Sequence, residues 1–245
     1  MTKIFKRIIP LAFLLCSVIL FGQNMTDIQY RFAPSIDYKI NKKLKVAFNY
    51  RYDLYKDLDA FKSNLFEVST QYEITKKIEV ETGYRFTTSF FEDSHRIFLG
   101  VKYSHKLKDF TLSFASKYQF STGSFDQDYM QYYKNPSNMF REKFSIEYNI
   151  PHSKVALYLA PELFLKYKNE TFYFNRMRYK IGGEYKLKYG NTIGISVFYD
   201  DKINPQKTDR IVFSTKYNLS IDALIKKLKK DKSKTNKKRF KQFPQ

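Results

Sequence analysis

The sequence predicts an all-β protein, a transmembrane antiparallel β-barrel of the outer-membrane type with 10–12 strands. Three observations lead to this class. Apolar and polar residues alternate along most of the chain, in runs long enough to cross a bilayer. Short connections alternate with longer ones, and the chain begins with a segment typical of exported proteins. The 21 Tyr and 24 Phe among 245 residues also exclude a disordered chain, because they can bury a large apolar surface.

Residues 1–22 are predicted to be a secretory signal peptide. Three basic residues precede the apolar run 8–21, which is the order of an n-region and an h-region. We place cleavage after Gly22, so that Gln23 becomes the mature N-terminus; an uncleaved signal anchor is the alternative. Cys16 is the only cysteine and lies inside the apolar run, so disulfides and thiolate metal sites are excluded. Export to the outer membrane of a Gram-negative bacterium also excludes nucleic acid as a partner.

Charge is concentrated at the two ends of the chain. The signal segment carries +3 and residues 222–245 carry +8, so residues 23–221 retain +9 of the total of +20. We predict that residues 222–245 form a mobile, basic periplasmic tail after a barrel of residues 23–221. Such a tail could bind an anionic polymer of the cell envelope, and a simply solvated tail is the alternative.

Eleven candidate strands follow in order. In each, the residues of one parity are apolar or uncharged, and none is Asp, Glu, Lys or Arg. Pro34 and Pro161 interrupt two of these series and are expected at bulges or bends. The strands are expected over residues 28–40, 44–54, 66–74, 78–90, 97–103, 110–120, 144–150, 155–165, 173–187, 193–199 and 211–221.

The opposite parity is densely charged. Its members are Lys45, Arg51, Glu67, Glu73, Glu79, Glu81, Arg85, Arg96, Lys102, Lys117, Arg141, Lys143, Glu147, Glu162, Arg176, Arg178, Lys180, Glu184, Lys186, Arg210 and Lys216. A membrane barrel turns its apolar face to lipid and its polar face to the lumen, whereas a soluble exported ligand-binding barrel does the reverse. The strand lengths, the signal peptide and the Tyr and Phe residues near strand ends favour the membrane.

The connections form two alternating sets. Tight turns are expected at Asn41–Lys43, Thr75–Lys77, Lys106–Asp109, Pro151–Lys154 and Lys188–Asn191, and these are assigned to the periplasm. Longer external loops are expected at Tyr55–Ser63, Phe91–Ser94, Ser121–Asn138, Lys166–Thr171 and Asp200–Asp209. Eleven strands conflict with the even number of single-chain bacterial barrels. Either a strand within residues 129–133 has been missed, or residues 26–40 do not span as one strand.

Motifs in the eighth and ninth strands resemble a known family. An acidic Pro161-Glu162-Leu163-Phe164 strand precedes Asn175-Arg176-Met177-Arg178 and then Gly182 and Tyr185. This pattern is similar to that of an uncharacterised family of outer-membrane β-barrels, domain of unknown function 2490. The resemblance extends over nearly the whole mature chain. It implies a barrel in the outer membrane and no assigned reaction, with Glu162, Asn175, Arg176 and Gly182 as motif-matching positions.

The charged parity supplies the candidate site, a network of charges in the lumen. We expect it to include Glu162, Arg176, Arg178, Arg51, Glu67, Arg85 and Glu81. Hairpin arithmetic pairs Glu162 with Arg176, Arg51 with Glu67 and Asp200 with Arg210 across neighbouring strands. Such a network could be a charged constriction, or it could only neutralise charges inside a narrow barrel.

A membrane-embedded lipid hydrolase is the alternative function. It would need a serine next to a histidine, and His95 with Ser89 or Ser94 is the nearest approach in sequence. We expect no catalytic residues, no metal and no cofactor. The leading expectation is a non-enzymatic narrow channel or structural envelope protein. Its expected partners are outer-membrane lipid and, during insertion, the barrel-assembly machinery.

Overall fold

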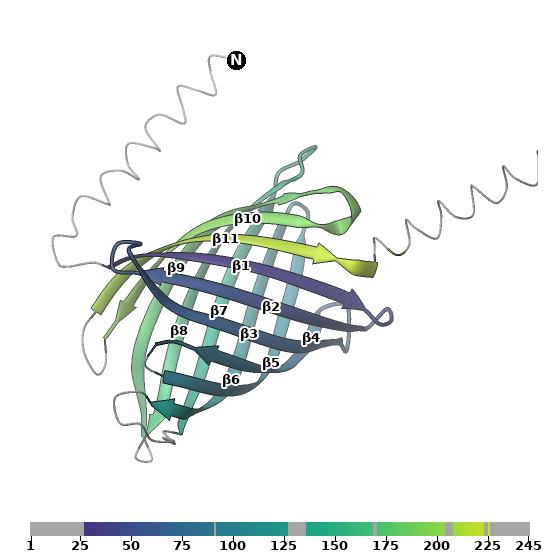
Figure 1. Cartoon of the computed structure of the whole chain (residues 1–245). Coiled ribbons are helices and arrows are strands. Elements are labelled where there is room, and N and C mark those ends of the chain that lie inside the picture. Colours follow the sequence, from purple (N-terminus) through teal and green to yellow (C-terminus); the bar gives the residue numbers. More distant parts are fainter. Residues whose placement is uncertain are drawn as a thin grey trace, which may run out of the picture.

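The computed structural model describes residues 27–90, 92–126, 136–168, 171–203, 208–222 and 225, and these form a closed barrel of eleven strands (Figure 1). The predicted fold class is therefore confirmed. The strands are β1 (Asp27–Lys39), β2 (Leu44–Tyr55), β3 (Ala60–Glu73), β4 (Ile78–Thr88), β5 (Glu92–Leu107), β6 (Phe110–Asp126), β7 (Ser137–Asn149), β8 (Val155–Lys168), β9 (Thr171–Lys186), β10 (Thr192–Lys202) and β11 (Thr208–Ser220). One 3₁₀ turn, η1 (Lys188–Gly190), lies between β9 and β10. No helix within the described residues has the length and apolar character needed to cross a membrane.

The barrel closes through a parallel pair. Every pair of consecutive strands is antiparallel, but β11 runs parallel to β1, with Tyr30 opposite Phe213. An odd number of strands requires one such pair, because direction alternates from strand to strand. Residues 27–39 form a single strand, so the suggestion that residues 26–40 fail to span is wrong. The suggested strand at residues 129–133 lies outside the described residues.

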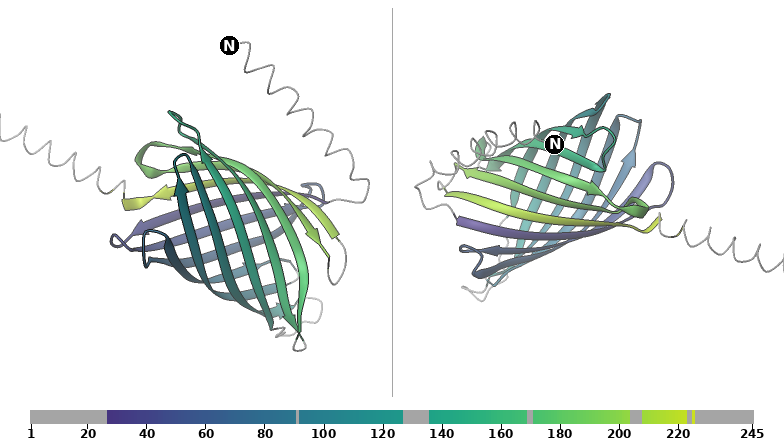
Figure 2. Two further views of the ribbon diagram at one scale, coloured as in Figure 1. Left: turned by 180° about the vertical axis from the view of Figure 1, so that it is seen from behind. Right: turned by 90° about the horizontal axis from the view of Figure 1, so that it is seen from above.

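The start of β1 and the end of β11 lie at opposite ends of the barrel, as two further views also show (Figure 2). We call the end at which β11 finishes the C-terminal end. All five predicted tight turns lie there, and the connections predicted to be longer lie at the other end. All five of the longer connections are shorter than predicted. Only residues 56–59 join β2 to β3 and only residues 169–170 join β8 to β9, because the strands themselves continue further.

The apolar parity faces outward. Leu99, Val101 and Ile195 expose 48–66% of their surface, although they lie well inside their strands. Glu162 and Asp200, by contrast, expose 2% or less and point into the barrel. This arrangement is the reverse of a soluble barrel, so the alternative with an inward apolar face is wrong. An apolar exterior on a sheet without edges is the arrangement that lipid requires.

Gly182 is required by the packing inside the barrel. It lies opposite Tyr158 on β8 and Ser196 on β10. A Cβ atom there would lie 2.6 Å from the Ile195 carbonyl oxygen and 2.7 Å from the Tyr158 hydroxyl. Backbone atoms on a neighbouring strand cannot move aside without breaking the ladder.

We therefore expect Gly182→Ala to lower the free energy of unfolding by about 1–3 kcal/mol. The neighbouring Gly183→Ala is the matched control, because its Cβ would meet the flexible Leu157 side chain at 3.2 Å and the Ala156 carbonyl oxygen at an ordinary contact distance of 3.5 Å. The temperature at which the folded form disappears in heat-dependent gel mobility measures the stability of both variants. Equal losses in the two variants would show that crowding at Gly182 is not what selects glycine.

Candidate functional site

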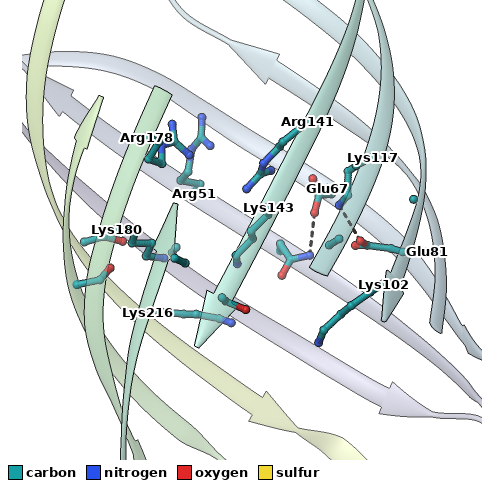
Figure 3. Close-up of a pocket in the computed structure, with 18 of the residues that line it drawn as sticks. Arg51, Glu67, Glu81, Lys102, Lys117, Arg141, Lys143, Arg178, Lys180 and Lys216 are labelled. Carbon is teal, nitrogen blue, oxygen red and sulfur yellow. Dashed lines mark hydrogen bonds and ion pairs between the residues drawn. The ribbon is translucent and has the colours of Figure 1, made fainter. Parts of the chain in front are cut away.

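The lumen holds a polar cavity of about 770 Å³ that side chains from all eleven strands line (Figure 3). Thirteen of the lining residues are Lys or Arg and five are Glu. Three more carboxylates, on Asp53, Glu162 and Asp200, lie buried against these arginines. Counting these eight acids against the thirteen bases leaves the described wall with a net charge of +5.

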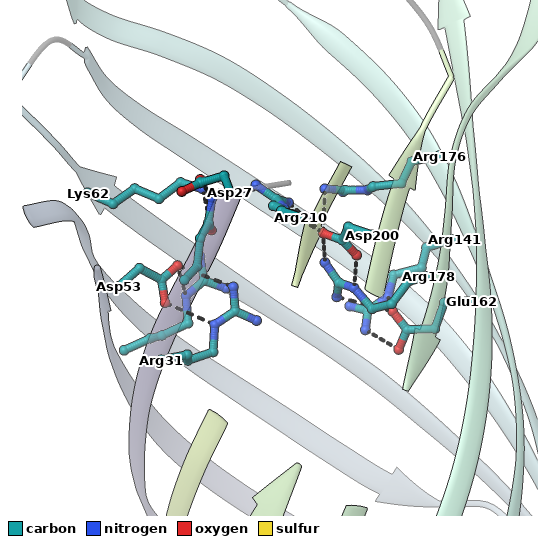
Figure 4. Close-up of polar contacts among 12 residues, drawn as sticks. Asp27, Arg31, Asp53, Lys62, Arg141, Glu162, Arg176, Arg178, Asp200 and Arg210 are labelled. Carbon is teal, nitrogen blue, oxygen red and sulfur yellow. Dashed lines mark hydrogen bonds and ion pairs between the residues drawn. The ribbon is translucent and has the colours of Figure 1, made fainter. Parts of the chain in front are cut away.

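Asp200 is the centre of the largest ion-pair cluster (Figure 4). Its carboxylate accepts hydrogen bonds from Arg178 Nε and Nη2 at 2.5 and 3.0 Å, and from Arg210 Nε and Nη2 at 2.8 and 2.6 Å. Arg176 Nη1 lies 3.4 Å from the same carboxylate. Only 1% of the Asp200 side chain is exposed. One buried carboxylate therefore orients three guanidinium groups, on β9 and β11.

Glu162 holds a second cluster next to the first. Arg141 Nη2 donates to its carboxylate at 2.7 Å, and Arg178 Nη1 donates at 3.3 Å. Arg178 thus joins Glu162 on β8 to Asp200 on β10. Lys143 approaches Glu162 only to 3.9 Å. Each of these carboxylates serves more than one cation, which is why the wall remains positive.

Two phenylalanines inside the barrel support the guanidinium groups. Arg176 lies 4.2 Å over the ring of Phe164, and Arg178 lies 4.4 Å over the ring of Phe198. Both rings are almost fully buried. The cation–π contacts add attraction and restrict the flat guanidinium groups to one orientation. The arginines are therefore held in place on two sides, by carboxylates and by rings.

Further ion pairs continue around the wall. Arg31 and Arg51 share Asp53, with Nε to carboxylate distances of 2.9 and 3.1 Å. On the strands that follow, Glu67 of β3 accepts from Arg85 of β4 at 2.5 Å, and Glu81 of β4 lies 2.6 Å from Lys117 of β6. The arginines also face one another, because Arg51 is within electrostatic reach of Arg31, Arg85 and Arg178. These contacts form a belt of arginines around the lumen.

Four lysines lie beyond this belt. We call Lys102, Lys143, Lys180 and Lys216 the lysine cluster; they come from β5, β7, β9 and β11 and all line the cavity. These four strands run in the same direction, towards the C-terminal end. Each lysine follows an arginine of its own strand by two to six residues. The lysine cluster therefore lies on the C-terminal side of the arginine belt, as Figure 3 shows.

Comparison with known proteins identifies the family of the chain. The model of a family described as "Protein of unknown function (DUF2490)" matches residues 29–211. The chain belongs to the DUF2490 family. No curated protein matches it. Two solved structures resemble it, each covering 71% of this chain. One, described as the NanC porin, has 11% identity, 87% of its own chain covered and a TM-score of 0.47. The other, described as the KdgM porin, has 14% identity, 91% covered and a TM-score of 0.44.

Two of the three cross-strand pairs predicted for this DUF2490 chain are wrong. Glu162 lies opposite Arg178 instead of Arg176, and Glu67 lies opposite Asn49 instead of Arg51. The cause is the same in both hairpins. A β-bulge near the connection, together with a tighter turn than predicted, shifts the register. The third pair is correct, because Asp200 lies opposite Arg210 in a regular hairpin.

The motif residue Asn175 occupies the bulge between β8 and β9. Phe174 lies opposite Leu165 and Arg176 lies opposite Phe164, so Asn175 is the extra residue of β9 at this bulge. Asn175 is buried, and its backbone carbonyl oxygen accepts a hydrogen bond from the backbone amide of Ile203. By adding one residue, Asn175 brings Arg178 to Glu162 and directs Arg176 towards Asp200. Asn175, Arg176 and Gly182, which were predicted as motif-matching positions, thus each have a structural role in this barrel.

Several contributors to the lumenal network were not among its predicted members. Arg31, Asp53 and Arg141 belong to it, and the buried rings of Phe164 and Phe198 support it. The sequence could have indicated the role of Phe164 and Phe198, because both fall on the charged parity. Aromatic rings on a charged face can receive guanidinium groups over their faces.

His95 has a tyrosine partner on the outer face of the barrel. The Tyr84 hydroxyl lies 2.5 Å from His95 Nδ1, and the ring of Phe86 lies 5.3 Å from the imidazole. Ser94 precedes His95 on the same strand, so its side chain points to the opposite face. The Ser89 hydroxyl bonds the Glu92 carbonyl oxygen. This geometry does not assemble the serine and histidine of a hydrolase.

Proposed function

We propose that the protein is a narrow channel for small solutes in the outer membrane of a Gram-negative bacterium. The observation that carries this proposal is the polar cavity of about 770 Å³, which all eleven strands line inside an apolar exterior. A channel needs a polar lumen and an apolar outside, and the polar cavity and the exposed apolar side chains support this proposal. Arginine and lysine side chains fill much of the lumen, so passage is limited to small solutes.

A structural role in the envelope is the second candidate. The dense ion pairs around Asp200 and Glu162 favour it, because such a network neutralises buried charges and fills part of a narrow barrel. Under this proposal the lumen conducts nothing and the barrel serves as a rigid membrane element.

Conductance in planar lipid bilayers separates the two candidates. We expect the purified full-length protein to give discrete current steps in KCl. Arg176→Ala should raise the step size, because this side chain lines the cavity and removing it leaves Asp200 with Arg178 and Arg210 as partners. Lys42→Ala in the β1–β2 turn is the control and should leave the step unchanged.

Silence at high protein load, with the protein shown by heat-dependent gel mobility to be inserted and folded, would contradict the channel and support the structural role. Fractionation of cells tests the location separately. A protein that is recovered in the soluble fraction and shows no mobility shift would contradict residence in the outer membrane.

Contacts with other molecules also follow from this proposal. Outer-membrane lipid covers the apolar exterior, and the barrel-assembly machinery inserts the chain. An anionic polymer of the envelope is the proposed partner of the Lys-rich tail, most of which lies outside the described residues, as does the proposed signal peptide.

A further inference from the structure

The lysine cluster has too few carboxylates near it. The 3.9 Å approach of Lys143 to Glu162 is its one ion pair within the described residues, and two arginines already engage that carboxylate at shorter distances. Lys180 lies 5.4 Å over the ring of Tyr158. None of the five described glutamates that line the same cavity forms an ion pair with the cluster. Glu67 and Glu81 pair with Arg85 and Lys117, and Glu79 lies opposite Lys102 in the β4–β5 ladder without an ion pair.

The four ammonium groups interact with one another across the lumen. Lys143 is within electrostatic reach of Lys102 and Lys216, and Lys180 is within reach of Lys143 and Lys216. Figure 3 shows the four side chains entering the cavity from separate strands. Like charges that face one another across a cavity repel and lower the stability of the empty barrel. A site that keeps such repulsion in the absence of ligand is suited to a ligand that removes it.

The chemistry of lysine indicates what kind of ligand fits. A lysine ammonium is a flexible point charge with three donors, whereas the neighbouring arginines are fixed by carboxylates and rings. Flexible donors on four strands can converge on oxygens at several positions. One anionic group cannot contact donors that approach from opposite walls, so the ligand needs two or more.

We infer that the lysine cluster is a binding site for small solutes that carry several anionic oxygen groups, carboxylates or phosphates, and that it makes the channel selective for them. This inference rests on the proposed channel and assigns the class of solute that the channel admits. The arginine belt lies next to the cluster along the lumen, so a polyanion that leaves the lysines meets further cations.

Current block tests the site with defined probes. Citrate, with three carboxylates, and pyrophosphate are added to the full-length protein conducting KCl, and glucose is the uncharged control. We expect at least one of the two anions to reduce the current in a saturable way, and glucose to have no such effect. Block by citrate alone would assign carboxylates, and block by pyrophosphate alone would assign phosphates.

Variants of the cluster connect the block to these lysines. We expect Lys143→Gln and Lys180→Gln each to raise the half-blocking concentration about tenfold, because each loses one charge-assisted contact. Lys76→Gln, the same change in the exposed β3–β4 turn, is the matched control and should behave as the unaltered protein. Current without block by either anion, or unchanged block in both cluster variants, would overturn the inference.

Thermal unfolding in detergent distinguishes failure of the inference from failure of the channel. Citrate or pyrophosphate should raise the unfolding midpoint of the unaltered protein at low salt. Without either anion, Lys143→Gln should unfold at a higher temperature than the unaltered protein, because repulsion is reduced, and its response to the anion should be weaker. A barrel that gives no current in bilayers but shows these shifts would contradict the proposed channel and support the anion-binding site. A barrel that conducts but shows none of these shifts would support the channel and contradict the anion-binding site.

Discussion

Asp200→Asn is expected to destabilise the barrel more than any other single change in the lumen, by about 3–5 kcal/mol of unfolding free energy. The asparagine has nearly the same shape but no charge. Arg178 and Arg210 would then lose a buried counterion that they contact at 2.5–3.0 Å, and Arg176 would lose it as well. Three guanidinium groups would face one another with no carboxylate between them. The midpoint of urea unfolding in detergent, followed by gel mobility, measures this loss.

Asp59→Asn is the control for this experiment, because Asp59 is exposed in the β2–β3 turn. Its effect should stay within about 0.5 kcal/mol. If Asp200→Asn lowered the unfolding free energy no more than Asp59→Asn does, water in the lumen would be screening the arginines. The ion-pair cluster would then contribute little to stability.

Leu99→Arg is expected to have the second largest effect, a loss of about 2–4 kcal/mol. Leu99 lies at the middle of β5 on the outer face, with 55% of its surface exposed. If lipid covers that face, the variant places a charge near the bilayer midplane. Equilibrium unfolding from lipid vesicles measures the loss.

Leu107→Arg provides a control on the same strand and the same face. Leu107 ends β5 and is 48% exposed, so an arginine there reaches the membrane surface and should cost about 0–1 kcal/mol. Depth is then the variable that differs between the two variants. Equal costs at Leu99 and Leu107 would contradict a lipid-covered exterior.

Alternation of apolar and charged residues was sufficient to predict the architecture. A shift of one residue moves every side chain of a strand from the lumen to the outside. A face free of charges over eleven strands therefore determines which side of each strand faces out. The same pattern could not resolve the closure, because parity along one strand carries no information about how the first and last strands meet. The parallel pairing of β1 with β11 explains the odd count.

The candidate site was predictable by residue type and not by partner. Parity placed Glu162, Arg176 and Arg178 on one face, but their pairing depended on the bulge at Asn175. A bulge is a local backbone event, and one extra residue in a hairpin changes each pair beyond it. Where the hairpin is regular, as between Asp200 and Arg210, simple counting succeeded. Counting within one hairpin also could not predict the shared carboxylates, because Glu162 and Asp200 each bond cations on the strands at both of their sides.

The seam between β1 and β11 sets the order of events when the barrel forms. Its partners, such as Asp27 and Arg210, lie in the first and last strands of the barrel, so this ladder has the greatest loop-closure cost. Its parallel geometry is also slightly weaker per residue than that of the antiparallel ladders. Side chains reinforce it, since the Ser35 hydroxyl and Asp37 both bond Asn218. We therefore expect the β1–β11 ladder to be the last to pair when the barrel forms and the first to open when it unfolds.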